Sequence, residues 1–292
     1  MKRIYLDNSA TTKVSPEVLD AILPYFTENY GNPSSLHSMG QEANVAVQTA
    51  REQVAKAIGA DAGEIIFTSC GTEADNLALV GTAYANKKKG DHIITSSVEH
   101  PAILRTCEYL EREGFKVTYL PVDKYGMVSP AAVEAAITPQ TTLISIMAVN
   151  NEIGTIQPIK EIGKIARDHN VYFHTDAVQG VGKLPINVKN DNIDMLSLAG
   201  HKIHAPKGVG ALYVKKGTRI QALIHGGGQE KNLKSGTENV PGIVGLGKAS
   251  EVAIRDFDRN TSHMTRLRDK LIDGILKIDH VRLNGHRTKR SP

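Results

Sequence analysis

Three stretches of the sequence place reactive side chains directly after short apolar runs. The stretch from Thr68 to Asn76 passes from small residues into a helical pattern, and a helix N-terminus presents free N–H groups that bind phosphate. The second stretch contains Asp176, a residue type used both in helix caps and in ligand-binding crevices. The third contains Lys202 after a Gly-His turn, and a partly desolvated lysine can form a Schiff base. Each stretch alone is also typical of an ordinary cap or loop.

Taken together, the three stretches meet the needs of pyridoxal phosphate. Its phosphate requires a helix N-terminus, its pyridine nitrogen a carboxylate and its aldehyde a lysine. The first stretch has neither the Walker A nor the Rossmann glycine pattern, so it does not indicate a nucleotide site. His201 and His204 have no neighbouring cysteine or carboxylate in the sequence, and we expect no metal site. The order of these residues predicts a pyridoxal phosphate enzyme.

The elements that must position these residues alternate along most of the chain. Helices are expected at residues 72–88, 102–113, 130–137 and 159–168, with one or two long helices over 241–278. Strands are expected at residues 64–68, 92–95, 115–120, 142–149, 171–175, 194–198 and 209–214, with a further strand at 280–283. Continuous apolar strands are buried on both faces. The pattern therefore predicts an α/β fold with a mostly parallel sheet flanked by helices, and a ligand site where the strands end.

Composition and charge exclude several other classes of protein. The 292 residues are 40% hydrophobic and 23% charged, which is typical of a soluble globular chain and unlike a collagen or a disulfide miniprotein. The net charge of +4 comes from four basic residues among the last eleven, so the body is neutral and nucleic acid is not an expected partner. These four residues are Arg282, Arg287, Lys289 and Arg290.

The cysteine content and the absence of long apolar runs indicate in which cellular compartment the protein is expected. Cys70 and Cys107 are too few for a disulfide framework or a zinc site. The N-terminal residues lack the apolar core of a signal peptide, and no run approaches the roughly 20 apolar residues of a membrane span. We expect a cytoplasmic protein with no membrane partner.

The sequence resembles the NifS/IscS-type cysteine desulfurases of the class V aminotransferase family. The matching motifs occur in family order at residues 5–12, 31–35, 67–76, 99–100, 149–154, 176–179, 200–202, 226–230 and 235–239. The resemblance implies a fold-type I, pyridoxal-phosphate-dependent transferase. It also implies a large cofactor-binding domain at residues 1–260, whose first residues associate with the small domain. Residues 261–292 would be the incomplete start of that C-terminal small domain.

The resemblance also implies a role for each matching residue. Lys202 would hold pyridoxal phosphate as a Schiff base, Asp176 would pair with the pyridine nitrogen, and Gln179 would bond to the ring hydroxyl. His100 would stack on the ring and take part in proton transfer, and Asn151 would contact the substrate carboxylate region. The phosphate ligands would be Gly71, Thr72 and His201, together with Thr237, which would reach the phosphate of the other subunit in a homodimer.

The family reaction converts L-cysteine to L-alanine and passes the sulfur to an enzyme cysteine as a persulfide. The sequence departs from the family at Ala199, where a hydroxyl residue often helps to hold phosphate, and at Lys231 and Lys234, where arginine is common. It ends before the segment expected to carry the catalytic cysteine and a substrate-binding arginine, and neither cysteine present matches that nucleophile. We therefore interpret the chain as C-terminally truncated, and expect it to bind the cofactor but to release little sulfide.

Two other functions stay open on the sequence alone. One is another class V enzyme, a selenocysteine lyase or a small-molecule aminotransferase, although the motifs at 150–154 and 226–230 favour a desulfurase. The other is a noncatalytic, truncated partner of a complete desulfurase. Iron–sulfur scaffolds or other sulfur-acceptor proteins are the expected partners. An incomplete small domain should leave one apolar helix face exposed, and that face consists of Leu267, Leu271, Ile275 and Ile278.

Overall fold

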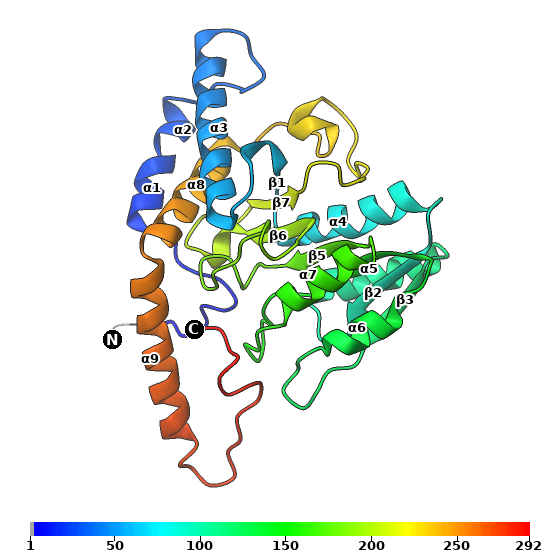
Figure 1. Ribbon diagram of the computed structural model, residues 1–292. Coiled ribbons are helices and arrows are strands. Elements are labelled where there is room, and N and C mark those ends of the chain that lie inside the picture. Colours follow the sequence, from blue (N-terminus) through cyan, green and yellow to red (C-terminus); the bar gives the residue numbers. More distant parts are fainter. Residues whose placement is uncertain (1–2) are drawn as a thin grey trace.

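A seven-stranded sheet organises residues 3–292, which the computed structural model describes (Figure 1). In space the strands follow the order β1-β7-β6-β5-β4-β2-β3. Neighbouring strands from β3 to β6 pair in parallel, whereas β7 runs antiparallel to both β6 and β1. The strands are β1 (Ile65–Thr68), β2 (His92–Ser96), β3 (Lys116–Leu120), β4 (Thr141–Ser145), β5 (Tyr172–Asp176), β6 (Met195–Ala199) and β7 (Gly210–Val214). The predicted α/β fold with a mostly parallel sheet is confirmed.

The helices predicted between the strands are also present. They are α4 (Gly71–Asn86), α5 (Pro101–Arg112), α6 (Pro130–Ala136) and α7 (Ile159–Asp168). Proline occupies the first helical position of α5 and α6, where its missing N–H would have no intrahelical partner. The terminal regions form α1 (Pro16–Ile22), α2 (Pro24–Thr27), α3 (Ser38–Ile58), α8 (Val240–Arg255) and α9 (Phe257–Ile275). Short 3₁₀ turns are η1 (Ala62–Glu64), η2 (Gly200–Lys202) and η3 (Gln229–Asn232).

Both faces of the sheet are covered, which explains why its strands are apolar without alternation. Successive strand residues point to opposite faces. In β1, Ile65 and Phe67 belong to the hydrophobic core that includes residues of α3, α6, α7 and α8. The residue between them, Ile66, belongs to a second core with residues of α4 and α5. The helical layers in Figure 1 therefore cover both faces of the central strands, so neither face is exposed to solvent.

The C-terminal region differs from the predicted pattern. No strand forms at residues 280–283, and the strand predicted there was wrong, because Val281 is exposed and a strand needs a neighbour to bond. An isolated bridge joins Thr155 to Arg290 instead. Similarly, β4 ends at Ser145, four residues earlier than the predicted 142–149 strand. The apolar face of α9 and the residues after it is exposed as expected, since Leu267, Leu271, Ile275 and Ile278 are 40–63% exposed.

The predicted domain boundary at residue 260 falls inside α9, which continues from α8 and projects away from the sheet (Figure 1). The first two residues of the predicted large domain lie outside the described residues. Within residues 3–292, no helix combines the length and the apolar character that crossing a membrane requires.

A buried ion pair connects the N-terminal helices to the loop after β7. The guanidinium of Arg51 on α3 donates two hydrogen bonds of 2.8 Å to the carboxylate of Glu230 and another to the carbonyl of Ile65. The same carboxylate accepts a hydrogen bond of 2.8 Å from the backbone N–H of Phe67. Glu230 and Lys231 both have positive φ, a conformation that is unfavourable for residues other than glycine. The ion pair therefore holds a strained turn against β1.

Replacing Arg51→Met should lower the free energy of unfolding by about 3–5 kcal/mol, because it leaves the Glu230 carboxylate buried without its partner. Urea unfolding followed by circular dichroism measures this loss. The control is Lys189→Met, which removes an exposed ion pair with Asp61 and should barely shift the unfolding curve. Equal shifts for the two variants would contradict the importance of the buried pair.

Candidate active site

The ends of five parallel strands meet at one edge of the sheet and surround a cavity. Because β7 is antiparallel to both neighbours, β1 runs parallel to β6 and ends at the same edge as β2, β4 and β5. The cavity has a volume of about 440 Å³, which suits a small molecule. It is lined by Gly71, Thr72, His100, Asn151, Asp176, Gln179, His201 and Lys202, together with Asp75, Met147 and Ala199. The fold thus brings together eight of the nine residues predicted from the sequence.

Thr237 is the predicted site residue that the structure places elsewhere. It is exposed, in the loop between η3 and α8, and does not line the cavity. Its predicted contact is with a second subunit, so its role stays a proposal.

The start of α4 forms one wall of the cavity. Cys70 is the N-cap and Gly71 is the first helical residue, one position before the predicted start. The first backbone N–H groups of a helix have no intrahelical acceptor and carry the positive end of its dipole. A Cβ atom on Gly71 would lie 2.8 Å from Cγ2 of Val178. Only glycine lets the helix start approach the loop after β5 so closely, and the resulting surface fits an anion such as phosphate.

Lys202 reaches the cavity from η2, directly after β6. Its ammonium donates a hydrogen bond of 2.8 Å to the carbonyl of Ala10 and another to the carbonyl of Ser9. Burial lowers the pKa of Lys202, while the charge of Asp176 partly opposes that shift. A lowered pKa increases the fraction of neutral amine, the form that attacks an aldehyde.

The N-terminal segment crosses the rim of the cavity beside this lysine. The backbone N–H and the hydroxyl of Thr12 both donate to the carbonyl of His201, each at 2.9 Å. The imidazole Nδ1 of His201 lies 3.1 Å from the hydroxyl of Thr11. Residues 11 and 12 therefore fix the turn that carries Lys202.

Three buried carboxyl groups surround the end of β5. Asp176 accepts a hydrogen bond of 2.9 Å from the N–H of Val178, and burial raises its pKa against the opposing effects of that bond, His100 and Lys202. Burial and the charge of Asp176 raise the pKa of Asp75 well above its usual value. Burial also raises the pKa of Glu99 to about 8. Like charges in one low-dielectric site disfavour each other, and among these three acids Asp176 is the one whose ionised form a neighbouring lysine, Lys202, favours.

One carboxyl oxygen in this group lacks a hydrogen bond among the described residues. Within residues 3–292, Oδ1 of Asp75 is buried and has no hydrogen-bond partner. Neutral His174 lies nearby, with Nε2 at 3.7 Å from that oxygen, and burial lowers the pKa of His174 to about 3. The base of the cavity is therefore acidic, with Asp75 beside Asp176, which suits a protonated ring nitrogen at Asp176.

His100 and Gln179 complete the predicted set. His100 lines the cavity and also caps α5, since its Nδ1 accepts a hydrogen bond of 3.1 Å from the N–H of Ala102. The amide of Gln179 donates to the carbonyl of Ser9 at 2.8 Å and accepts from the ammonium of Lys183 at 3.0 Å. His100 can therefore cap α5 and line the cavity at the same time.

Three further ionisable residues around the site, Asp75, Glu99 and Lys183, had no role predicted from the sequence. Asp75 is an acid on the buried face of α4, between Ala74 and Asn76 of the first stretch. Glu99 directly precedes His100, and its carboxylate accepts from the hydroxyl of Ser96 and the N–H of Met147. The third is Lys183, four residues after Gln179. The signal available in each case was an ionisable residue beside or within a matched motif.

A larger cavity of about 760 Å³ adjoins the first one. Asn151, Gln179 and Lys202 line both. Residues of α9 and of the C-terminal segment contribute to its outer wall. The candidate active site is therefore open to a space between the sheet and α9.

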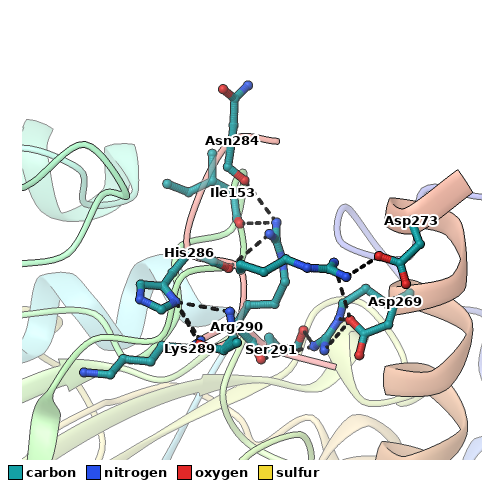
Figure 2. Close-up of polar contacts among 11 residues, drawn as sticks. Ile153, Asp269, Asp273, Asn284, His286, Lys289, Arg290 and Ser291 are labelled. Atoms are coloured by element: carbon teal, nitrogen blue, oxygen red, sulfur yellow. Dashed lines mark hydrogen bonds and ion pairs between the residues drawn. The ribbon is translucent and has the colours of Figure 1, made fainter. Parts of the chain in front are cut away.

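The C-terminal segment is held in this position by its basic residues (Figure 2). The guanidinium of Arg290 donates a hydrogen bond of 2.7 Å to the carbonyl of Ile153. Arg268 of α9 donates one of 2.6 Å to the carbonyl of Ser291, and Arg287 pairs with Asp273. Two of the four basic residues near the end of the sequence, Arg287 and Arg290, thus make specific contacts.

Comparison with known proteins identifies the family. Residues 4–292 match the aminotransferase class-V family. This chain belongs to that family. It is 59% identical over 289 residues to cysteine desulfurase IscS of Methanosarcina thermophila, covering 99% of this chain and 72% of the relative. The family resemblance inferred from the motifs is confirmed.

Solved structures agree with the fold. A NifS-like protein has a TM-score of 0.92 and 46% identity, covering 94% of this chain and 76% of that protein. A structure described as SspA in complex with cysteine has a TM-score of 0.83 and 47% identity, covering 85% of this chain and 72% of that one. The predicted fold-type I architecture is confirmed.

The cofactor of the family fits the cavity. Class V enzymes of the desulfurase type depend on pyridoxal phosphate. The helix start at Gly71, the buried carboxyl group of Asp176 and the lysine of lowered pKa each meet one of its chemical requirements. Within the described residues, no group of three or more histidine, cysteine, aspartate or glutamate side chains is arranged to hold a metal ion.

Replacing Glu99→Gln tests the protonation of the buried acids. The pKa of Glu99 rises from 4.5 to about 8 on folding, so the folded state binds the proton more tightly and wild-type stability falls as pH rises through this window. Glutamine does not titrate, so the stability deficit of the variant should shrink between about pH 5 and pH 8. Urea unfolding at both pH values measures it. A deficit independent of pH would contradict the assignment, and exposed Glu52→Gln serves as the control.

Proposed function

We propose that this chain is a pyridoxal-phosphate-dependent cysteine desulfurase, which converts L-cysteine to L-alanine and passes the sulfur to a cysteine thiol. In the balanced reaction, the C–S bond of the substrate breaks and an S–S bond forms on the acceptor thiol, while the substrate Cβ gains a hydrogen. The relatives named cysteine desulfurase support this reaction. The observation that carries the proposal is one cavity in which a helix N-terminus, a buried carboxylate and a lysine of lowered pKa meet.

Each residue of the cavity has a proposed role in holding the cofactor. The amine of Lys202 would hold the aldehyde carbon, and Asp176 would keep the ring nitrogen protonated. His100 would pack against the ring, and Gln179 would donate to the ring hydroxyl. The bound cofactor supplies an electron sink that stabilises negative charge at the substrate Cα. The phosphate would lie at the start of α4, bound by Gly71, Thr72 and His201.

The chain's own groups would manage the protons and orient the substrate. Asp176 would be the ionised acid, because Lys202 favours its charged form, whereas burial raises the pKa of Asp75 and of Glu99 with no opposing effect from a lysine among residues 3–292. Burial lowers the pKa of Lys202, and its amine, at the cavity wall, would serve as the base that takes up a substrate proton. Asn151 lies where the two cavities meet, a position suited to the substrate carboxylate.

Neither cysteine is assigned the acceptor role. Cys107 is completely buried in α5, and burial raises its pKa to about 12, so its thiol is not ionised at neutral pH. Cys70 is the N-cap of α4, on the cavity wall assigned to the phosphate. Sulfur-acceptor proteins, including iron–sulfur scaffolds, would be the partners in the cytoplasm.

The proposed quaternary structure is a homodimer. The N-terminal region presents a set of exposed apolar side chains, and exposed apolar clusters mark interaction surfaces. Exposed Thr237 would reach the phosphate of the partner subunit. Residues 1–260 would form the large domain, and residues 261–292 would begin the small one. The exposed apolar residues are Leu23, Phe26, Tyr30, Leu36 and Val45, with exposed fractions of 52–91%.

Lys202→Ala tests the proposed attachment. The wild-type chain mixed with pyridoxal phosphate should show the absorbance band of a protein-bound Schiff base, and borohydride reduction should fix the cofactor on the peptide containing Lys202. The alanine variant should lose both signals, whereas exposed Lys207→Ala should retain them. Mass spectrometry of the reduced protein identifies the labelled peptide. Labelling of a different lysine would overturn the assignment.

Introducing charge into the apolar surface tests the dimer. The double variant Phe26→Asp/Leu36→Asp should be shifted from dimer toward monomer. Burying the two introduced carboxylates in an interface has a high desolvation cost. Sedimentation velocity measures the change. The matched control is Leu271→Asp on α9, which is 63% exposed and should leave the dimer intact. A monomeric wild-type chain would refute the proposed assembly.

A further inference from the structure

We propose that Lys183 is a positioning residue that fixes the amide of Gln179 with its N–H side toward the cofactor cavity. The inference rests on the proposed function, in which Gln179 donates to the ring hydroxyl of pyridoxal phosphate. Lys183 does not line the cofactor cavity. It lies on the wall of the larger adjoining cavity, and its hydrogen bond to Gln179 is the contact that connects it to a residue of the cofactor cavity.

The turn after β5 brings the two side chains together. Lys183 follows Gln179 by four residues, a spacing that places side chains on the same side of a helical turn. The N–H groups of Val181 and Lys183 bond to the carbonyls of Ala177 and Gly180, and Gly182 supplies a positive φ of 74°. The ammonium Nζ of Lys183 lies 3.0 Å from Oε1 of Gln179.

Donor chemistry selects one orientation of the amide. The two ends of a glutamine amide have almost the same size, but one accepts hydrogen bonds and the other donates them. A lysine ammonium has only donors, so it bonds to the carbonyl end of Gln179 and not to the amino end. The amino end then faces the carbonyl of Ser9, 2.8 Å away, which also accepts from Lys202. Lys183 thereby directs the N–H of Gln179 toward the site.

The environment of Lys183 supports a role in orientation rather than in stability. Burial, with a smaller contribution from the charge of Lys202, lowers the pKa of Lys183 to about 8. The structure gives its ammonium no carboxylate partner within residues 3–292, and its hydrogen bond is to a neutral amide. Burying an amine without a counterion is unfavourable. A methionine of similar length would avoid that cost, but it could not distinguish the two ends of the amide.

A double-mutant cycle on pyridoxal phosphate binding tests the inference. The full chain, freed of cofactor, is titrated with pyridoxal phosphate, and dissociation constants are obtained by equilibrium dialysis. Gln179→Met and Lys183→Met should each weaken binding about three- to tenfold, since each removes an oriented hydrogen bond. If Lys183 acts through Gln179, the double variant binds no more weakly than Gln179→Met alone. Lys183→Arg keeps a donor-only group and should bind within about twofold of wild type.

A second readout and a control separate orientation from general damage. The two single variants and the double variant should share one altered absorbance spectrum of the bound cofactor. Lys164→Met, at an exposed lysine of α7, should match wild type in both measurements. If Lys183→Met does not fold, Lys183→Gln replaces it in the cycle, because an amide both donates and accepts and so does not select one end of Gln179.

The outcomes distinguish this inference from the proposed function. Losses that multiply in the double variant would show that Lys183 acts independently of Gln179, and would overturn the inference alone. Unchanged affinity in Lys183→Met would also overturn it. A wild-type chain that binds no pyridoxal phosphate would overturn both proposals. Non-additive losses with a shared spectrum and rescue by arginine would establish Lys183 as the residue that orients Gln179.

Discussion

The common direction of five strands is the constraint on which the whole site depends. Parallel strands end at one edge of a sheet, so the loops after β1, β2, β4, β5 and β6 meet even though their residues are far apart in sequence. The antiparallel strand β7 has a particular importance here. It separates β1 from β6 and still leaves them parallel. The start of α4 therefore borders the same cavity as Asp176 and Lys202.

The electrostatics of the site follow from this convergence. Three carboxyl groups are buried around the end of β5, and the charge of Asp176 raises the pKa values of Asp75 and Glu99. The ammonium of Lys202 favours the ionised form of Asp176. The acid that ends a central strand is consequently the one whose ionised form has a lysine beside it. A site with a negative base and a helix N-terminus on one wall is suited to a ligand that is cationic at one end and anionic at the other.

Local patterns predicted the elements well where the elements are buried on both sides. The apolar runs of the strands and the glycine and proline positions around the helices placed each central element to within a few residues. The pattern failed at residues 280–283, where an apolar run has the composition of a strand but no neighbour to pair with. It also extended β4 too far, because the apolar residues after Ser145 belong to the core but lie outside the regular strand.

The sequence by itself determined the order of the reactive residues, the α/β class and the family, because motif chemistry and hydrophobic periodicity are local properties of the chain. Only the tertiary structure showed that Asp75 and Glu99 share the environment of Asp176, that Arg290 binds the loop at Ile153, and that Lys183 contacts Gln179. A pKa shift depends on desolvation and on charges brought close by folding. The direction of a hydrogen bond likewise depends on which partner faces each end of an amide. The spacing of residues in the sequence specifies neither the pKa shift nor the direction of the hydrogen bond.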